Sequence, residues 1–310
     1  MYDVIVVGAG VVGCSTAREL SRYKLDVLVL EKGHDICAGA SKANSGMIHA
    51  GYDPIPGTNE AKFNAPGSKM MYEICDELDV PYEKSGTTVF ATDESGMKEL
   101  QKLEGFAREN HVEARIVEPP ELYELQPNIG EDVKAVLWVP EGGITTPFSV
   151  TFALAENAYH NGVEFEKEAE VAAIEKHLGE DGTNWFEVKA GGKTYQSRII
   201  INCAGGCSDK INNMVSDDHY HIIPLDRKIS DKLTTTLMET PHDLPGGGHT
   251  KGMAIIPTTG GTMILGCDAT EVGDPDFTAT RRASIDQIVD YFKEAWKYLP
   301  LDGDEFPTES

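Results

Sequence analysis

The stretch Tyr2-Asp-Val-Ile-Val-Val7, followed directly by Gly8-Ala-Gly-Val-Val-Gly13, decides the fold. Its first six residues are almost continuously apolar and rich in β-branched side chains, which is typical of a strand buried on both faces of a parallel sheet. A helical pattern over Cys14–Tyr23 and a second apolar strand over Asp26–Glu31 come next. A strand, a turn, a helix and a strand within about 30 residues predict a right-handed parallel crossover.

The three glycines of the turn have the spacing Gly-x-Gly-x-x-Gly, which suits a bound dinucleotide. Gly8 permits the tight turn, Gly10 leaves room for a pyrophosphate against the backbone, and Gly13 lets helix and strand pack closely. The helix N-terminus offers unpaired N–H groups and the positive end of the helix dipole. Glu31 can accept hydrogen bonds from the adenosine ribose. These residues predict a dinucleotide site without distinguishing NAD from FAD.

Length and charge narrow the class of protein. The chain has 310 residues, enough for two domains on a prior of roughly 150 residues each. It carries 27 Lys and Arg against 51 Asp and Glu, a formal net charge of −24. Because so acidic a surface repels phosphate backbones and anionic lipids, we expect no nucleic-acid partner and no polybasic membrane anchor. An anionic substrate would have to be captured by a few local donors.

Cysteine usage and hydropathy suggest a cellular compartment. The six cysteines are scattered and form no CxxC pair, so we predict buried thiols rather than a disulfide framework or a metal site. The N-terminus has no basic region before its first strand, which argues against a signal peptide. No run of about 18 apolar residues predicts a transmembrane segment. We therefore expect a cytoplasmic protein, and peripheral association with a membrane stays open.

Two distant segments carry a family resemblance. Gly39-Ala-Ser-Lys-Ala-Asn-Ser-Gly46-Met-Ile-His49-Ala-Gly51-Tyr-Asp53 resembles the segment by which the glycine/D-amino acid oxidase superfamily binds FAD. Within that superfamily it is most similar to FAD-dependent glycerol-3-phosphate dehydrogenases and oxidases and to L-2-hydroxyglutarate oxidases. Ile199–Ile211 looks like the later FAD-contacting strand and turn of these enzymes, and the run from Lys251 to Thr280 resembles the substrate domain of the glycerol-3-phosphate group.

The resemblance implies FAD as the cofactor and assigns roles to individual residues. His49 would lie near the flavin ring as the catalytic base, since a neutral imidazole can take a hydroxyl proton while hydride leaves carbon. Apart from the resemblance, the basic residues Arg227, Lys228 and Lys251 are the candidates for binding the anion of the substrate. The residues that we predict to contact FAD are Gly8, Gly10, Val12, Gly13, Glu31, Lys32, Ser41, Asn44, Ser45, Gly46, Val171, Ala204, Gly205 and Asp209.

The resemblance also implies an architecture. We predict an α/β protein with a Rossmann-like FAD-binding domain over residues 1–80 and 147–214, built on a parallel sheet with a small antiparallel sheet. An inserted α+β substrate domain with a mainly antiparallel sheet would take residues 81–146 and 215–300. Residues 301–310 would form a tail, and the family's C-terminal return segment is expected to be absent from these 310 residues. Within the first domain we expect a helix over Ala65–Leu78 and another over Phe148–Asn161. The apolar face of the second helix would consist of Phe148, Phe152, Ala155 and Tyr159.

The expected reaction is oxidation of a small 2-hydroxy compound by hydride transfer to flavin N5. Glycerol 3-phosphate, giving dihydroxyacetone phosphate, is the favoured substrate, so the partner would be a small anionic hydroxy compound. Two alternatives stay open: an L-2-hydroxyglutarate oxidase or dehydrogenase, and a truncated FAD-domain protein without catalysis. The electron acceptor, whether oxygen, a quinone or a partner protein, does not follow from the sequence.

Overall fold

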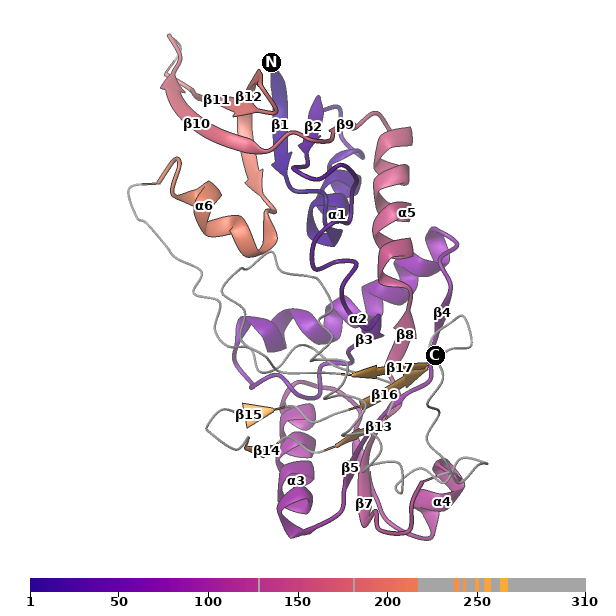
Figure 1. Ribbon diagram of the computed structural model, residues 1–310. Helices are drawn as coiled ribbons and strands as arrows, with labels where there is room; N and C mark the ends of the chain where they lie inside the picture. Colours follow the sequence, from indigo (N-terminus) through magenta and orange to yellow (C-terminus); the bar gives the residue numbers. More distant parts are fainter. Residues whose placement is uncertain are drawn as a thin grey trace. The chain divides into compact units, whose positions relative to one another are not determined.

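The computed structural model describes residues 1–216, apart from residues 128 and 181, and the backbone of five short strands between residues 237 and 266 (Figure 1). The described chain falls into two compact units. The first holds residues 1–44 and 147–216, and the second holds residues 45–146 together with the five short strands. Each unit has its own sheet and its own core.

The first unit is built on one six-stranded sheet, in the order β10-β11-β12-β1-β2-β9. The strands from β12 to β9 are parallel, and β10 and β11 extend the sheet in antiparallel fashion. Their bounds are β1 (Tyr2–Val7), β2 (Val27–Leu30), β9 (Glu164–Glu166), β10 (Val171–Leu178), β11 (Asn184–Ala190) and β12 (Lys193–Asn202). The predicted Rossmann-like sheet with an antiparallel addition is confirmed.

Two helices pack side by side in this unit, α1 (Val11–Leu20) and α5 (Pro147–His160) (Figure 1). The guanidinium Nε of Arg18 donates to Asn157 Oδ1 at 3.1 Å between them. After β12 the chain forms the 3-10 turn η1 (Gly205–Cys207) and the short helix α6 (Ser208–Asn212). The turns before α1 and after β12 therefore follow two parallel strands that are neighbours in the sheet, β1 and β12.

The buried face of α5 differs from the apolar face read from the sequence. Three residues of that face, Phe148, Phe152 and Tyr159, are 49%, 42% and 65% exposed, and the fourth, Ala155, is buried. The buried positions include Val150, Leu154 and Ala158 instead. Because α5 is apolar around most of its circumference, periodicity admits more than one inward face, and packing against neighbouring elements selects between them.

The second unit contains a six-stranded sheet in the order β17-β16-β13-β5-β7-β6, in which only the β13–β5 pair is parallel. Two smaller sheets, β3-β8-β4 and β14-β15, accompany it. The strand bounds are β3 (Met47–Ile48), β4 (Tyr82–Glu83), β5 (Thr87–Ala91), β6 (Arg115–Val117), β7 (Ala135–Val139), β8 (Gly143–Thr145), β13 (Leu237–Glu239), β14 (His242–Asp243), β15 (His249–Thr250), β16 (Ala254–Pro257) and β17 (Met263–Gly266). The predicted α+β insertion with a mainly antiparallel sheet is confirmed.

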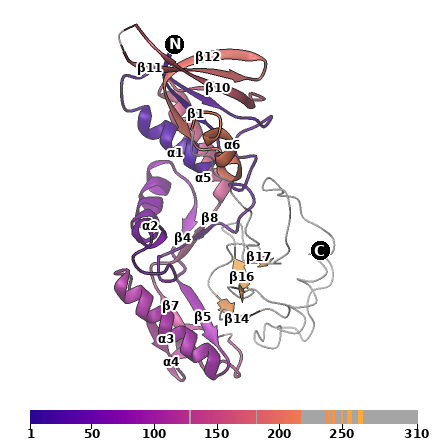
Figure 2. The same ribbon diagram turned by 90° about the vertical axis from the view of Figure 1, so that its left-hand side faces the viewer.

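Residues 45–146 of the second unit form the helices α2 (Asn59–Glu77), α3 (Glu94–Glu109) and α4 (Glu121–Leu125). Helix α3 lies along β5 and β7 (Figure 2). It buries Leu100, Leu103 and Ala107 against Val89 and Leu137 of those strands. This cluster, together with Ala50 and Tyr52 from the loop after β3, is the main core of the unit.

The first boundary between the units differs from the predicted one at residue 80. Residues 45–80 lie with the second unit because β3 and β4 both pair with β8. The Tyr72 hydroxyl of α2 also donates to the Glu141 carbonyl oxygen at 2.9 Å. Helix α2 starts at Asn59 rather than at the predicted Ala65. The Thr58 side chain accepts from the Ala61 amide, and Pro66 lies inside the helix. The assignment of an FAD role and a substrate role to the two units remains our proposal.

The described part of the chain has further general features. Among its helices none combines the length and apolar composition needed to cross a membrane. Its residues hold no group of three or more His, Cys, Asp or Glu that could bind a metal. Cys14, Cys37, Cys75 and Cys207 are buried thiols, and burial raises the pKa of Cys14 to about 12. A thiol with that pKa is almost entirely protonated at neutral pH and is a poor nucleophile.

Candidate functional site

The turn between β1 and α1 packs backbone against backbone. Gly8 has φ +105°, a conformation that favours glycine, and a Cβ there would run into the carbonyl oxygen of Cys203. A Cβ at Gly13 would run into the carbonyl oxygen of Gly8. These two glycines therefore bring the ends of β1, α1 and β12 into direct contact. The third glycine of the motif, Gly10, has an ordinary φ of −77° and caps the helix without a side-chain hydrogen bond.

The N-terminus of α1 presents free donors. The Val11 amide donates to Ser41 Oγ at 2.9 Å. Within residues 1–216 as described, the amides of Gly10, Val12 and Gly13 have no protein acceptor. A Cβ on Gly10 would come within 3.0 Å of Ser41 Oγ, so this side of the turn is closely lined by the Ser41 loop. Free amides at the positive end of a helix dipole fit the diphosphate of a dinucleotide.

Glu31 lies just after β2 and is nearly buried, with 8% of its surface exposed. One carboxylate oxygen accepts from the Ala9 amide at 2.7 Å and the other from the Gly33 amide at 2.8 Å. A carboxylate has about four lone-pair positions, so two remain for ribose hydroxyls. Glu31 thus fixes the turn on which the cofactor would lie, a role that the sequence motif alone does not reveal.

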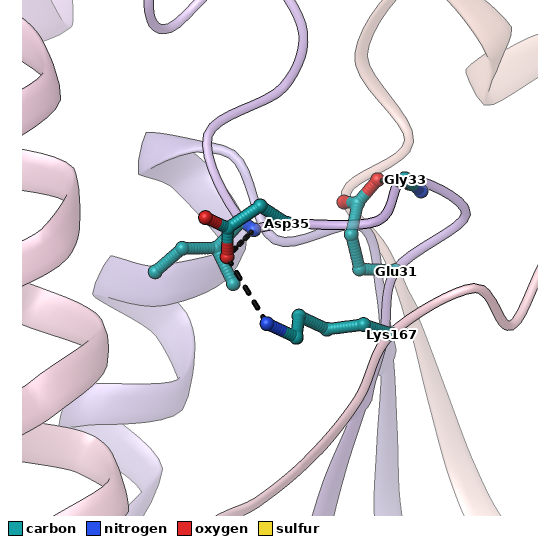
Figure 3. A network of polar contacts seen from close by, with 5 residues as sticks. Glu31, Gly33, Asp35 and Lys167 are labelled. Carbon is teal, nitrogen blue, oxygen red and sulfur yellow. Dashed lines mark hydrogen bonds and ion pairs between the residues drawn. The ribbon is translucent and has the colours of Figure 1, made fainter.

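The loop after Glu31 is held at several points. The Asp35 carboxylate accepts two hydrogen bonds, one from the backbone amide of the next residue, Ile36, at 3.0 Å, and one from Lys167 Nζ at 3.3 Å (Figure 3). The hydrogen bond from Ile36, and then the contact with Lys167, lower the pKa of Asp35. Asn44 Nδ2 donates to the carbonyl oxygens of Ala40 and Ser41. The carbonyl contact to Ser41 helps to hold the residue that faces the helix N-terminus.

The turn after β12 carries three other predicted FAD contacts. The Ala204 amide donates to Asn202 Oδ1 at 3.2 Å, Gly205 has φ +55°, and Asp209 Oδ1 accepts from the Lys210 amide at 2.8 Å. In the same unit, Lys32 Nζ lies 3.9 Å from Cys207 Sγ. The Val171 side chain belongs to the core of the unit, so its backbone is the part left to contact a ligand.

The other predicted site residues fall elsewhere. Ser45 and Gly46 belong to the second unit, where the Gly46 carbonyl oxygen accepts from the Thr145 amide at 2.8 Å. Arg227, Lys228 and Lys251 lie outside the described residues. The structure therefore brings together the residues around the β1–α1 turn, Glu31 and Ser41, and it leaves the proposed anion contacts undescribed.

His49 directly follows β3 in the second unit, and its loop is fixed by a residue that the sequence reading passed over. Asn110, at the C-terminal cap of α3, donates from Nδ2 to the carbonyl oxygens of Gly51 and Pro54, at 3.1 and 2.8 Å. Gly51 has φ +95°, and a Cβ there would come within about 3 Å of Ala65. Asn at a helix end is a common capping signal, but its long-range contact has no local signature.

Glu31→Gln is expected to lower both the free energy of unfolding and the affinity for FAD. An amide has one acceptor oxygen, so one of the Ala9 and Gly33 amides would face an NH₂ group, and an unsatisfied buried donor costs about 1–3 kcal/mol. Chemical denaturation and FAD titration measure the two effects. Glu156→Gln, at an exposed position of α5 in the same unit, is the matched control and should change neither. Unchanged values for Glu31→Gln would show that its carboxylate is not needed there.

Asn110→Ala is expected to lower the free energy of unfolding by about 1–3 kcal/mol, because two partly buried carbonyl oxygens lose their donor. Hydrogen exchange of the amides from Ala50 to Asp53 should also become faster. The control is Asn161→Ala, directly after α5, whose exposed side chain donates to the carbonyl oxygen of Asn157 near the end of that helix. Equal losses of stability in the two variants would contradict the role of Asn110.

The comparisons agree with this geometry. The model of the family described as "DAO: FAD dependent oxidoreductase" matches residues 3–306. A glycerol 3-phosphate dehydrogenase of Caloramator mitchellensis is 39% identical over 310 residues, with 97% of this chain and 62% of that protein covered. An L-2-hydroxyglutarate dehydrogenase of Escherichia coli (strain K12) is 30% identical, covering 72% of this chain and 52% of that protein.

A similar solved structure is that of the dithionite-reduced L-alpha-glycerophosphate oxidase of Mycoplasma pneumoniae with FAD bound. Its TM-score is 0.73 at 23% identity, over 96% of this chain and 79% of that one. This likeness confirms the fold. The chain spans about three fifths of the length of the Caloramator protein and about half that of the Escherichia coli protein. The predicted family is confirmed: the chain belongs to the family of FAD-dependent oxidoreductases named DAO.

Proposed function

We propose that this protein oxidises glycerol 3-phosphate to dihydroxyacetone phosphate with FAD as the oxidant. The observation that carries the substrate is the 39% identity to a glycerol 3-phosphate dehydrogenase along 97% of the chain. When bound, FAD supplies the acceptor for the hydride that leaves carbon 2 of the substrate, at flavin N5. The hydroxyl proton passes to the imidazole of His49, so that the C–H and O–H bonds break and a C=O bond forms.

The first unit supplies the binding half of this proposal. The free amides at the start of α1 would take the diphosphate, and Glu31 the ribose. Ser41 would hold the loop beside them, since its hydroxyl already accepts from the first amide of the helix. Ala204, Gly205 and Val171 would offer backbone contacts at the end of the neighbouring strands. None of these residues needs a charged side chain to meet the phosphates, in keeping with the acidic surface.

The second unit supplies the proposed base. A side chain that removes a proton must keep its place while the substrate changes, and His49 begins the loop that is held by Asn110, Gly51 and the core residue Tyr52. General-base catalysis contributes about 10²–10⁴-fold to a rate. Imidazole suits this role because its ordinary pKa of about 6.5 leaves it largely neutral at physiological pH.

An L-2-hydroxyglutarate dehydrogenase is the second candidate function, favoured by the 30% identity to the Escherichia coli enzyme of that name. Both substrates are small anionic secondary alcohols, so the same base and the same oxidant would serve. They differ in the anion to be captured, a phosphate in one and two carboxylates in the other.

Comparison of the two substrates tests the proposal. The purified protein is first analysed for bound flavin, and its activity is then measured with a dye as electron acceptor. We expect FAD in the protein and turnover with glycerol 3-phosphate that exceeds turnover with L-2-hydroxyglutarate. The reverse preference would establish the second candidate. Flavin without turnover of either compound would favour a non-catalytic FAD-binding protein.

A further inference from the structure

An acidic residue lies close to His49 in the turn that follows β3. The imidazole Nδ1 is 3.8 Å from Asp53 Oδ1, and the two side chains are only 22% and 15% exposed. Both of these atoms are shielded from solvent. A carboxylate beside one ring nitrogen of a histidine determines which nitrogen carries the proton, since it favours an N–H that points toward it. The neutral ring then has its lone pair on the other nitrogen.

The turn keeps this spacing between His49 and Asp53 nearly fixed. Ala50 and Tyr52, which alternate with them, are 1% and 2% exposed and sit in the core beneath α3. Asn110 bonds the carbonyl oxygens of Gly51 and Pro54. The backbone on both sides of Asp53 is therefore anchored, and the carboxylate has little freedom to move away from the ring.

The charge in this turn also lies on Asp53 and not on its neighbour Tyr52. Burial, and secondly the negative charge of Asp53, raise the pKa of Tyr52 well above its ordinary value. Tyr52 therefore stays a neutral phenol, and the charge next to the imidazole is that of the Asp53 carboxylate. The 3.8 Å separation is longer than a hydrogen bond of about 3.2 Å at most. In ligand-free structures catalytic hydrogen bonds are often long, and they tighten when substrate binds.

We propose that Asp53 is the positioning residue of His49: it holds the proton on Nδ1 and leaves Nε2 as the atom that accepts the substrate's hydroxyl proton. Asp53 itself touches neither substrate nor cofactor in this role and acts through the imidazole. The inference rests on the proposed function, since it assigns the acceptor atom of the proposed base.

The test uses the full chain labelled with ¹⁵N at its histidines, and it reads the protonation of each ring nitrogen by NMR. The His49 signals are identified by their loss in His49→Gln. In the wild-type protein near pH 8 we expect Nδ1 to carry the proton. A ring protonated mainly on Nε2 would overturn the inference, whether or not FAD is loaded.

Variants of Asp53 distinguish a positioning role toward His49 from a purely structural role. In Asp53→Asn the amide can present either its oxygen or its NH₂ to Nδ1, so the Nε2-protonated form should become populated. Flavin reduction by glycerol 3-phosphate should fall, at most by the about 10²–10⁴-fold expected for loss of the base. Asp53→Glu, which keeps the carboxylate, should recover part of both. Asp132→Asn, on an exposed loop of the same unit, should change neither.

The outcomes for the two hypotheses differ. A His49 tautomer that is the same in the wild-type protein and in Asp53→Asn means that Asp53 does not set the ring, and the inference fails. A tautomer that shifts while flavin reduction keeps its rate means that Asp53 sets the ring as inferred but that His49 is not the base, and the proposed mechanism fails.

Discussion

His49→Ala in the FAD-loaded protein is expected to slow flavin reduction by glycerol 3-phosphate by about 10²–10⁴-fold, the usual contribution of a general base. The yellow cofactor should stay bound, because the residues that would hold its ADP half belong to the other unit. Stopped-flow absorbance under anaerobic conditions gives the rate, and ultrafiltration gives the bound flavin. Alanine also removes the imidazole that faces Asp53, so thermal unfolding is measured in parallel.

His160→Ala is the matched control for this substitution, since His160 is exposed at the end of α5. It should leave both the reduction rate and the flavin content unchanged. A reduction rate for His49→Ala within a factor of two or so of the wild-type rate would remove His49 from the reaction. Its part would then be limited to the structure of the loop after β3.

Gly13→Ala is expected to have the largest effect on the first unit. The new Cβ would run into the carbonyl oxygen of Gly8 and would also touch the Cys203 side chain. Both neighbours belong to the closely packed junction of β1, α1 and β12, and overpacking of this kind costs typically 1–3 kcal/mol, occasionally more. We expect a lower free energy of unfolding and loss of tight FAD binding together, measured by chemical denaturation and by fluorescence titration with FAD.

Substitutions of two other glycines serve as comparisons for the effect of Gly13→Ala on stability and FAD binding. In Gly10→Ala the new Cβ would contact Ser41 Oγ at 3.0 Å, so little stability should be lost. FAD binding should still weaken, because the Cβ would take up the room left for the pyrophosphate. Gly105→Ala, in the middle of α3 with open space around it, should raise stability by about 0.5–1 kcal/mol and leave FAD binding alone. Wild-type stability and affinity in Gly13→Ala would contradict the packing described here.

The parts of the site that could be predicted are those with local signatures. The β1–α1–β2 segment was predictable because a buried strand, a glycine turn and a second strand follow one another within about 30 residues. The position of Glu31 after β2 is what suggests it as a ribose contact, and that role stays a prediction. Its two bonds to the Ala9 and Gly33 amides were not predictable, because only the folded turn brings both donors to one carboxylate.

The parts that escaped prediction depend on distant pairing. Residues 45–80 belong to the second unit because β8, nearly a hundred residues beyond β3, pairs with both β3 and β4. Proline is tolerated best in the first turn of a helix, so Pro66 favoured a helix start at Ala65, about six residues after the start at Asn59 that the structure shows. The hydrogen bonds from Asn110 to the loop after β3 likewise join positions far apart in the sequence, and no local sequence pattern predicts them.

Anaerobic mixing of the FAD-loaded protein with glycerol 3-phosphate tests the proposed oxidation by itself, because it needs no electron acceptor. The absorbance of oxidised flavin reports the reaction, and a second sample uses substrate deuterated at carbon 2. We expect that the flavin is bleached, that dihydroxyacetone phosphate forms in equal amount, and that deuteration slows the bleaching. Flavin that stays oxidised when glycerol 3-phosphate is added would contradict the proposed function. This holds whether L-2-hydroxyglutarate bleaches the flavin or no small hydroxy compound does.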